Sequence, residues 1–383
     1  MSDTRLIVAD SIASVSRRDW EALTATDVYG QYGWLQAIEV SMRDARRSQY
    51  FLLYRNDQLI AAAVGYRFAR SRDLNWLDDL LFGRMASLAA RFHLTPDDAL
   101  YFGPLIGHGR PVFWDRDCSA GDAAERIRLL LEKIAARKES AGVTFAFGRI
   151  PVEETRLLTA LRGLGYVETR SWPISYLNVQ WTNFEDYVSS LSRRGENLPN
   201  KIRREVATPE KKGVRVVRLG DFGSEAVAIH RLFDHTHRKN SGGAIGFGPE
   251  LIEALATYHP AGCVMTVARA DGKPGLLGCA LLLVADGVAS GALVGIAAQA
   301  LNRVAFTYFN LCFYAPIQFC LENDIRRIYF GGGRRHMKRR RGCNDMDVSL
   351  FMRPAGPVGR LFWRAWFVMH RYWVRRKSLR DTK

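Results

Sequence analysis

Residues 263–296 read CVMTVARADGKPGLLGCALLLVADGVASGALVGI, and this stretch decides the fold class. It holds three runs of apolar and β-branched residues, over 263–270, 276–284 and 287–295. An Asp-Gly pair separates the first two runs, and such pairs are typical of tight turns between strands. The stretch therefore predicts three consecutive β-strands.

Helical patterns lie on both sides of these strands. Apolar residues recur at helical spacing over 221–239, 249–258 and 305–323. A further strand is expected at 325–330, directly before three glycines. The second half of the chain thus combines helices with both hairpins and single strands.

The first half of the chain repeats this order with little residue identity. The strand, turn and strand of residues 51–65 match those of 264–283. The helix, short turn and strand of residues 129–148 match those of 314–331. The pattern indicates a mixed α/β (α+β) domain, a mixed central sheet flanked by helices, used twice.

Composition excludes several classes of protein. The 383 residues are 48% hydrophobic and contain 33 Gly and 13 Pro, which excludes a fibrous or disordered chain. Six cysteines without a C-x-x-C spacing argue against a disulfide scaffold and against a zinc ribbon, and we expect no metal. With neither a signal peptide nor a spanning segment visible, we expect a cytoplasmic protein, consistent also with peripheral contact at the inner face of the membrane.

Two segments carry the excess positive charge of the chain. The formal net charge is +16, and residues 193–218 contribute +6 while residues 334–383 contribute +12. Basic segments attract nucleic acid, phosphorylated cofactors or an anionic bilayer. We expect the two segments to meet in space and to bind one phosphate-bearing donor.

Three stretches resemble the Fem-like branch of the GNAT acyltransferase superfamily. They are FEDYVSSLSRRGENLPNKIRREVATPEKKGVRVV (184–217), YAPIQFCLENDIRRIYFGGGRRHMKRRRGC (314–343) and, more weakly, YGQYGWLQAIEVS (29–41). The resemblance implies two tandem GNAT-like domains. The expected domains are 1–180 and 219–355, joined by basic linker helices at 181–218 and closed by a basic aromatic helix at 356–383.

The resemblance also implies an acyltransferase that forms an amide bond by transfer to an amine acceptor. The donor is aminoacyl-tRNA in one class and acyl-CoA in the other, used as a substrate rather than as a tightly bound cofactor. The stretch IAAQALNRVAF (296–306) departs from the pyrophosphate loop of CoA-binding GNAT enzymes. Together with the concentrated basic charge, this departure favours aminoacyl-tRNA. The alternatives are an acyl-CoA-dependent GNAT enzyme, or a non-catalytic protein that binds nucleic acid or anionic membrane on a GNAT scaffold.

Aminolysis of an ester or thioester needs a donor for the developing oxyanion and close positioning of both substrates. Lys338 stands at the position of the lysine that follows the glycine-rich strand in the family. The candidates by role are, for catalysis, Lys338 and His336; for the donor phosphates, Lys201, Arg203, Arg204, Arg341 and Gly342; and for the acceptor, Tyr308, Asn310 and Asp234.

The C-terminal stretch GRLFWRAWFVMHRYWVRRKSLR (359–380) is both aromatic and basic. Three readings fit this composition: a closing helix docked on the second domain, a stack against nucleic acid bases, or contact of residues 360–383 with an anionic membrane. Docking on the second domain is the preferred expectation.

Overall fold

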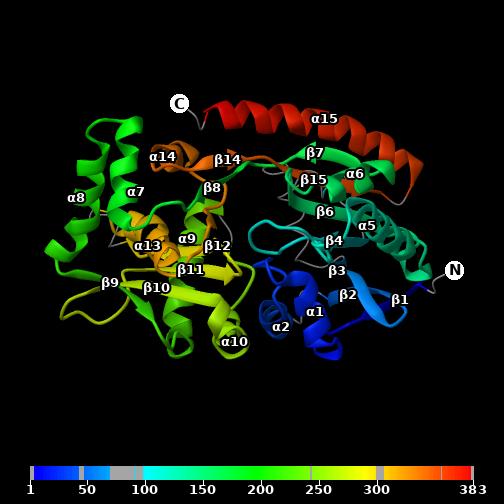
Figure 1. Ribbon diagram of the computed structural model, residues 1–383, viewed down its shortest axis with the longest axis horizontal. Coiled ribbons are helices and arrows are strands. Elements are labelled where there is room, and N and C mark those ends of the chain that lie inside the picture. The colour runs from blue at the N-terminus through cyan, green and yellow to red at the C-terminus, as the bar shows by residue number, and fades with distance from the viewer. Residues whose placement is uncertain are drawn as a thin grey trace. The chain divides into compact units, whose positions relative to one another are not determined.

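A computed structural model describes residues 4–42, 47–69, 91, 98–241, 244–298, 306–354 and 356–380 (Figure 1). The chain divides into two compact units. Unit 1 comprises Met1–Ala25, Tyr29–Trp172 and Asp347–Lys383, and unit 2 comprises Thr26–Val28 and Pro173–Met346. Each unit is built on its own mixed sheet, which is the expected mixed α/β architecture used twice.

The sheet of unit 1 has the strand order β1-β2-β3-β4-β6-β15-β7, and β5 also pairs with β3. Its strands are β1 (Thr4–Ala9), β2 (Arg47–Arg55), β3 (Gln58–Ala69), β4 (Asp98–Phe102), β5 (Val112–Trp114), β6 (Thr144–Pro151), β7 (Val167–Arg170) and β15 (Val348–Arg353). Only the β4–β6 pair is parallel among these described strands. Asn56 and Asp57 join β2 to β3 with φ of 48° and 61°, the left-handed geometry of a two-residue hairpin turn.

Helices cover both faces of this sheet. They are α1 (Arg17–Thr24), α2 (Tyr32–Ser41), α5 (Ala120–Ala135), α6 (Thr155–Gly163) and α15 (Pro357–Arg380). The buried side of α5, with Ile127 and Leu130 among its residues, joins the core cluster that contains Phe51 of β2. The preceding residue of β2, Tyr50, points to the other face and meets Trp20 of α1 edge to face.

Unit 2 has the strand order β14-β8-β13-β12-β11-β10-β9. Its strands are β8 (Ile174–Asn178), β9 (Val214–Leu219), β10 (Cys263–Ala270), β11 (Gly278–Ala285), β12 (Val288–Ile296), β13 (Arg327–Tyr329) and β14 (Asn344–Met346). Its helices are α7 (Phe184–Ser190), α8 (Leu198–Lys211), α9 (Ala226–Ser241), α10 (Glu250–Tyr258), α12 (Thr307–Phe309), α13 (Ala315–Glu322) and α14 (Arg335–Arg340). Short 3-10 turns at Ile12–Ser14, Lys138–Ser140, Leu191–Arg194, Gly223–Glu225 and Pro260–Gly262 complete the two units.

Both faces of the second sheet are also covered. One core cluster packs α7, α8 and α13 against residues such as Leu282 and Ile328 of the sheet. On the other face α9 approaches β12 so closely that a Cβ on Gly295 would lie 2.6 Å from the backbone carbon of Leu232. Glycine at this position therefore permits the contact between helix and sheet.

The long apolar helix expected at 305–323 is divided in the structure. Residue 305 lies outside the described residues, α12 begins at Thr307, and a π-helical turn over Asn310–Tyr314 separates it from α13. Such turns insert an extra residue into a helix and are frequent at functional sites. Residues 70–90 and 92–97 lie outside the described residues.

The two units exchange their closing strands. After β7 of unit 1 the chain enters β8, which pairs with β13 and β14 of unit 2. After β14 it returns to β15, which is inserted between β6 and β7 of unit 1. Each sheet therefore contains an inner strand that is separated in sequence from most of its partners.

This exchange changes the expected boundaries in two respects. The expected second domain, 219–355, contains β15, which belongs to unit 1. The expectation that the C-terminal helix docks on the second domain is wrong, because α15 packs against β7 (Figure 1). Apolar side chains of α15 fit the unit 1 surface, and sequence composition does not tell which surface an amphipathic helix covers.

We expect a chain truncated after Met346 to lose the folded state of unit 1, because β6 and β7 would lose the strand that joins them. Unsatisfied backbone donors and acceptors would remain on both strands. The measurement is urea unfolding followed by near-ultraviolet circular dichroism and limited proteolysis. A chain truncated after Pro354, which keeps β15, is the matched control. Equal protease resistance of unit 1 in both chains would contradict the role given to β15.

Candidate functional site

A cavity opens in unit 2 where β12 and β13 cease to pair. The two strands are parallel partners only over Val288–Ser290 and Arg327–Tyr329, although β12 continues to Ile296. The register with β11 shifts between Leu281 and Leu282, so β12 bulges at this point. The cavity has a volume of about 460 Å³ and is lined by β12, by the loop after β13, by the π-helical turn and by α14.

The wall of this cavity is mostly apolar, with a few polar groups that converge on it. Apolar lining residues are Ala280, Leu281, Leu282, Ala292, Leu293, Val294, Leu311, Phe313, Pro316 and Phe330. Polar groups come from Lys338, Tyr308, Cys312, Thr266, Asn240 and Arg334. A concave apolar site with a small number of placed polar groups is typical of small-ligand sites.

Lys338 is the buried cation of this cavity. Only 5% of the residue is exposed, and its Nζ donates to the carbonyl oxygens of Phe330 at 2.6 Å and Gly331 at 2.8 Å. Burial removes water from the ammonium and lowers the pKa of Lys338 to about 8. The side chain is therefore held at the carboxyl end of β13 and remains mostly protonated at pH 7.

Tyr308 and Cys312 face the same cavity as neutral donors. The pKa of Tyr308 is raised, first by the neighbouring Cys312 and then by burial. Burial raises the pKa of the Cys312 thiol to about 12. Because a protonated thiol is a poor nucleophile, this cysteine is not suited to covalent catalysis at neutral pH. Tyr308, a candidate from the sequence for the acceptor, lines this cavity.

His336 does not join Lys338 in the cavity. Both residues lie on α14, where two positions are about 200° apart around a helix of 3.6 residues per turn. Lys338 is buried, whereas His336 is exposed. The helical periodicity of α14 therefore separates the two side chains.

Arg341, expected to bind a donor phosphate, is instead held in a buried ion pair with Glu205 of α8. The two side chains are 3% and 2% exposed, and Nη2 of Arg341 lies 2.6 Å from Oε2 of Glu205. The hydroxyl of Tyr314 also donates to Glu205 and accepts from Nε of Arg341 at 2.9 Å. The guanidinium lies 3.9 Å from the ring centroid of Phe309. Its charge is thus balanced inside the protein.

Asn310 and Gly342 support the same buried network. Nδ2 of Asn310 donates to the backbone oxygen of Glu205 at 2.9 Å, so this side chain positions α8. Gly342 has φ of +90°, and a Cβ there would lie 3.3 Å from both Leu177 and Leu191. Glycine is required by the turn, and the role expected for it in phosphate binding has no support in this geometry.

A second, basic pocket of about 540 Å³ brings the two basic segments together. It is lined by Gly195, Glu196, Asn197, Leu198, Asn200, Lys201, Arg204 and Arg340. Lys201 and Arg204 come from α8, and Arg340 comes from α14. Within the part of the chain that the structure describes, none of these three cations forms an ion pair with a carboxylate. The expectation that the two segments meet is confirmed for residues 193–218 and for the part of the second segment that belongs to unit 2, since residues 347–383 belong to unit 1.

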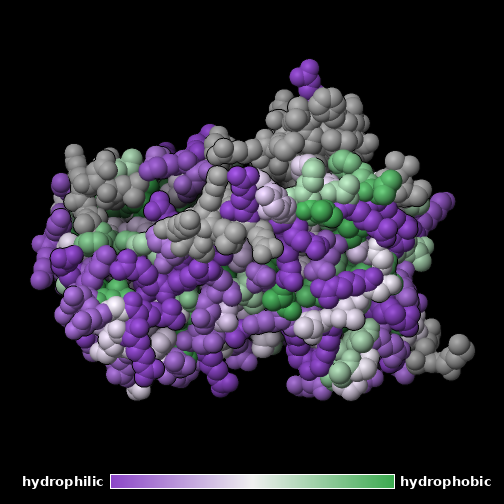
Figure 2. Space-filling view, turned by 90° about the horizontal axis from the view of Figure 1, so that it is seen from above, coloured by the Kyte–Doolittle hydropathy of each residue, from purple (hydrophilic) through white to green (hydrophobic). Residues whose placement is uncertain are grey.

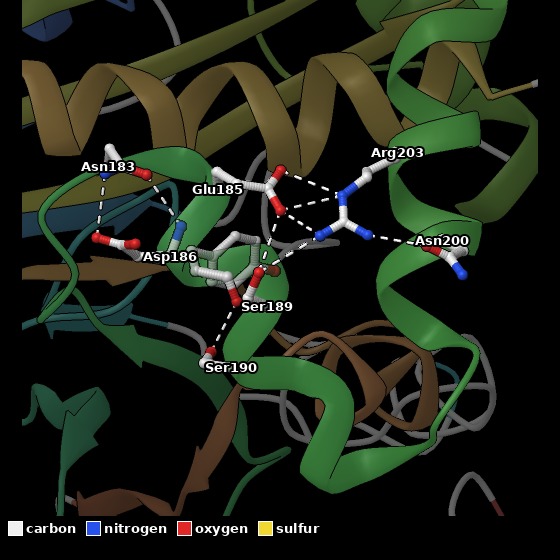
Figure 3. Close-up of polar contacts among 8 residues, drawn as sticks. Asn183, Glu185, Asp186, Ser189, Ser190, Asn200 and Arg203 are labelled. Carbon is white, nitrogen blue, oxygen red and sulfur yellow. Dashed lines mark hydrogen bonds and ion pairs between the residues drawn. The ribbon is translucent and has the colours of Figure 1, made fainter.

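Arg203 points away from this pocket although it is adjacent to Arg204. Its guanidinium forms hydrogen bonds and an ion pair with Glu185 of α7, and Nη1 donates to Asn200 at 2.9 Å (Figure 3). The contact holds α8 against α7, and the basic charge is balanced. Successive residues on a helix lie about 100° apart, which explains the different surroundings of the two arginines.

Asp234 lies outside both pockets. Its carboxylate accepts from Nε of Arg238 at 2.6 Å and from the backbone nitrogen of Ile245 at 2.9 Å. The hydrogen bond from Arg238 lowers the pKa of this carboxyl. Asp234 thus fixes the chain after α9, and its expected contact with an acceptor has no support in this position.

Sequence reasoning missed Arg340, Glu205 and Tyr314. Arg340 lies in a run of bases, and a helical reading of residues 335–340 places it opposite Lys338. Glu205 lies within the basic segment 193–218, and its side chain is almost fully buried. A charge pattern gives no sign of such a pairing, because the partner is 136 residues away.

The model of the FemAB-like family, described as peptidoglycan biosynthesis/recognition, matches residues 11–352. The chain belongs to the FemAB-like family. No curated protein matches it in sequence. Among solved structures, this FemAB-like chain is similar to FemX, with a TM-score of 0.61 and 12% identity over 93% of this chain and 99% of that one.

Other solved structures align with this chain at low identity. A conserved protein of unknown function from Bacteroides thetaiotaomicron aligns with a TM-score of 0.54 and 11% identity over 91% of this chain and 99% of that one. A tandem GNAT protein from the clavulanic acid biosynthesis pathway aligns with a TM-score of 0.47 and 11% identity over 93% and 99%. This FemAB-like chain therefore shares the fold of FemX, built here on two mixed sheets.

Loss of the buried carboxylate Glu205 should reduce the free energy of unfolding far more than loss of the exposed carboxylate Glu185 on the neighbouring helix. Glu205→Gln leaves Arg341 buried without its counter-charge, and we expect the free energy of unfolding to fall by about 3–5 kcal/mol. Glu185→Gln breaks an exposed pair, and we expect little change because water and salt screen it. Urea denaturation of both variants makes the comparison. A similar small effect for both substitutions would show that the buried pair is not a structural support.

Proposed function

We propose that this protein transfers an aminoacyl group from aminoacyl-tRNA to an amine and so forms an amide bond. The family and the GNAT-like fold support an acyl or aminoacyl transferase in general. The observation that carries the proposal is the placement of Lys338 in an apolar cavity beside the unpaired part of β12. The basic pocket nearby supports a donor that bears phosphates.

The reaction begins with attack of the neutral amine on the ester carbonyl carbon of the donor. A C–N bond forms while the carbonyl oxygen takes up negative charge, and the ammonium of Lys338 stabilises this oxyanion. The C–O bond to the ribose then breaks, and the ribose oxygen takes a proton as the amine nitrogen loses one. No covalent enzyme intermediate is required, in agreement with the protonated thiol of Cys312.

The short helix α14 links the two parts of the site. Lys338 on one side lines the cavity, and Arg340 on the other lines the basic pocket. A donor with its phosphates on Arg340, Arg204 and Lys201 would therefore be held by the same helix that presents the catalytic ammonium. Proximity of this kind is the main contribution of the enzyme when it provides no nucleophile.

The acceptor is an amine whose reacting end fits the cavity of about 460 Å³. The description of the family, peptidoglycan biosynthesis/recognition, supports an amino group on a cell-wall precursor as the first acceptor to test. Tyr308 supports this site as a hydroxyl donor inside the cavity. Residues 299–305, which include most of the stretch that departs from a CoA loop, lie outside the described residues.

Lys338→Met removes the ammonium and keeps an unbranched side chain of similar length. We expect turnover to fall by about 10²–10³-fold, the usual loss for one oxyanion donor. Because only the protonated form acts and the pKa is about 8, wild-type turnover falls as pH rises through 8. The pH–rate profile measures this limb, which disappears in the variant. His336→Gln, on the exposed side of α14, keeps both turnover and the limb. Turnover of Lys338→Met at the wild-type level would contradict the catalytic role.

The basic pocket predicts different effects for two adjacent arginines. Arg204→Gln removes an unpaired cation, so we expect weaker tRNA binding. The slope of the logarithm of the binding constant against the logarithm of the salt concentration should become shallower by about one unit. Arg203→Gln removes a cation that Glu185 already balances, and we expect a smaller change. Filter binding of charged tRNA at several salt concentrations measures both.

The donor itself is tested by product formation from a mixed pool of aminoacyl-tRNA, with candidate amines and mass-spectrometric detection. Ribonuclease treatment of the pool should abolish the product. Product that survives ribonuclease and requires acyl-CoA would replace the tRNA donor by a CoA thioester. Binding of tRNA without any product from either donor would indicate a binding protein.

A further inference from the structure

The C-terminal helix α15 has two apolar sides. One side carries Trp363, Phe367, His370 and Val374, which are all buried. These residues recur about every 3.6 positions, so they form one stripe that packs on unit 1. The contact includes Oγ1 of Thr169, which donates to the backbone oxygen of Phe367 at 3.3 Å, and the Trp172–Trp373 ring pair at 5.3 Å. This side explains why the helix docks.

The opposite side is apolar but exposed. Leu361 is 73% exposed, Val368 is 70% exposed and Tyr372 is 69% exposed. With Ala365 they follow steps of four, three and four residues, so they form a second stripe about half a turn from the first. Met369, 58% exposed, widens it. Half of the exposed large hydrophobic residues in the described part of the chain lie on this one helix, which distinguishes it from scattered surface residues.

Positive charge borders the exposed stripe. The sequence of α15 contains seven Arg and Lys residues and no Asp or Glu. Arg360, Arg364, Arg371 and Arg376 are exposed. Seen from above, the surface that carries α15 shows hydrophobic patches directly beside hydrophilic ones (Figure 2). An apolar stripe with basic margins fits the boundary between the head groups and the acyl chains of an anionic bilayer.

We propose that the outer side of α15 binds the surface of an anionic lipid bilayer. Within the described residues, no helix combines the length and the apolar character needed to cross a bilayer, so the binding is peripheral. The apolar stripe enters the interface, and Arg360, Arg364 and Arg376 contact lipid phosphates. Arg371 instead donates from Nη2 to the backbone oxygen of Glu168 at 3.1 Å. The inner stripe keeps the helix on unit 1, and α15 therefore lies parallel to the membrane plane.

Two other occupants fit the surface less well. A second copy of α15 would bring another seven positive charges against these seven, without acids to balance them. A nucleic acid backbone would satisfy the arginines but would leave Leu361, Val368 and Tyr372 in water. A bilayer rich in anionic lipid satisfies the charges and the apolar stripe together.

The test is flotation of the full-length protein with vesicles of phosphatidylglycerol and phosphatidylcholine in equal parts, or of phosphatidylcholine alone. We expect flotation with the mixed vesicles and little with phosphatidylcholine alone. The triple variant Leu361→Ser, Val368→Ser, Tyr372→Ser should partition about 10-fold or more weakly. Arg360→Gln with Arg364→Gln should weaken binding and reduce its sensitivity to salt.

Val227→Ser is the matched control, because Val227 is 52% exposed on α9 of unit 2. It should float as the wild type does. Urea unfolding checks that the triple variant is folded, as expected for side chains that face solvent. Equal flotation of the triple variant, or no flotation of the wild type, would overturn the proposal. A dimeric mass in light scattering that the triple variant abolishes would assign the stripe to a second copy instead.

Discussion

The buried ion pair between Arg341 and Glu205 is the interaction on which unit 2 depends. It joins the end of α14 to α8, Tyr314 adds the π-helical turn, and Tyr187 of α7 donates to the backbone oxygen of Arg341 at 2.9 Å. A charge pair this deeply buried is tolerated only when hydrogen bonds satisfy both partners, as they do here. Because α8 and α14 also carry the cations of the basic pocket, the same contact sets the geometry of that pocket.

The duplicated fold is used differently in the two units. In unit 2 the parallel strands β12 and β13 separate and leave a cavity. In unit 1 the parallel pair β4 and β6 ends at Phe102 and Phe147, and the ring of Tyr101 packs closely on the glycines that follow. A Cβ on Gly148 would lie 2.3 Å from the Tyr101 hydroxyl oxygen, so glycine is needed for the ring to fit. The space where the parallel strands end is thus filled by an aromatic ring in unit 1 and forms an open cavity in unit 2.

Local patterns predicted the elements, whereas contacts between distant residues did not follow from them. The strand Cys263–Ala270 has the predicted bounds, because a run of alternating and β-branched residues followed by Asp-Gly is a local signal. The insertion of β15 into unit 1 depends on pairing between residues about 200 positions apart, which no local pattern encodes. The position of Lys338 after the glycine-rich strand predicted a site residue, and the structure places it in the cavity. The separate surroundings of Arg203 and Arg204 depend on Glu185 and on the direction of each side chain. Charge runs therefore locate a basic surface without telling which cations are free.

The hydrogen-bond partners of Lys338 leave its buried ammonium without a carboxylate counter-charge. Asp345, the neighbouring carboxylate, is occupied by ion pairs with Arg335 and Arg339. Carbonyl oxygens hold Lys338 instead, and a carbonyl dipole orients an ammonium without cancelling its net charge. A direct carboxylate partner would hold the pKa high, whereas burial, as the largest cause, lowers the pKa of Lys338 to about 8. Two carbonyl oxygens thus fix the position of the Lys338 ammonium beside the cavity. Asp345 does not neutralise this charge, because its carboxylate is already paired with Arg335 and Arg339.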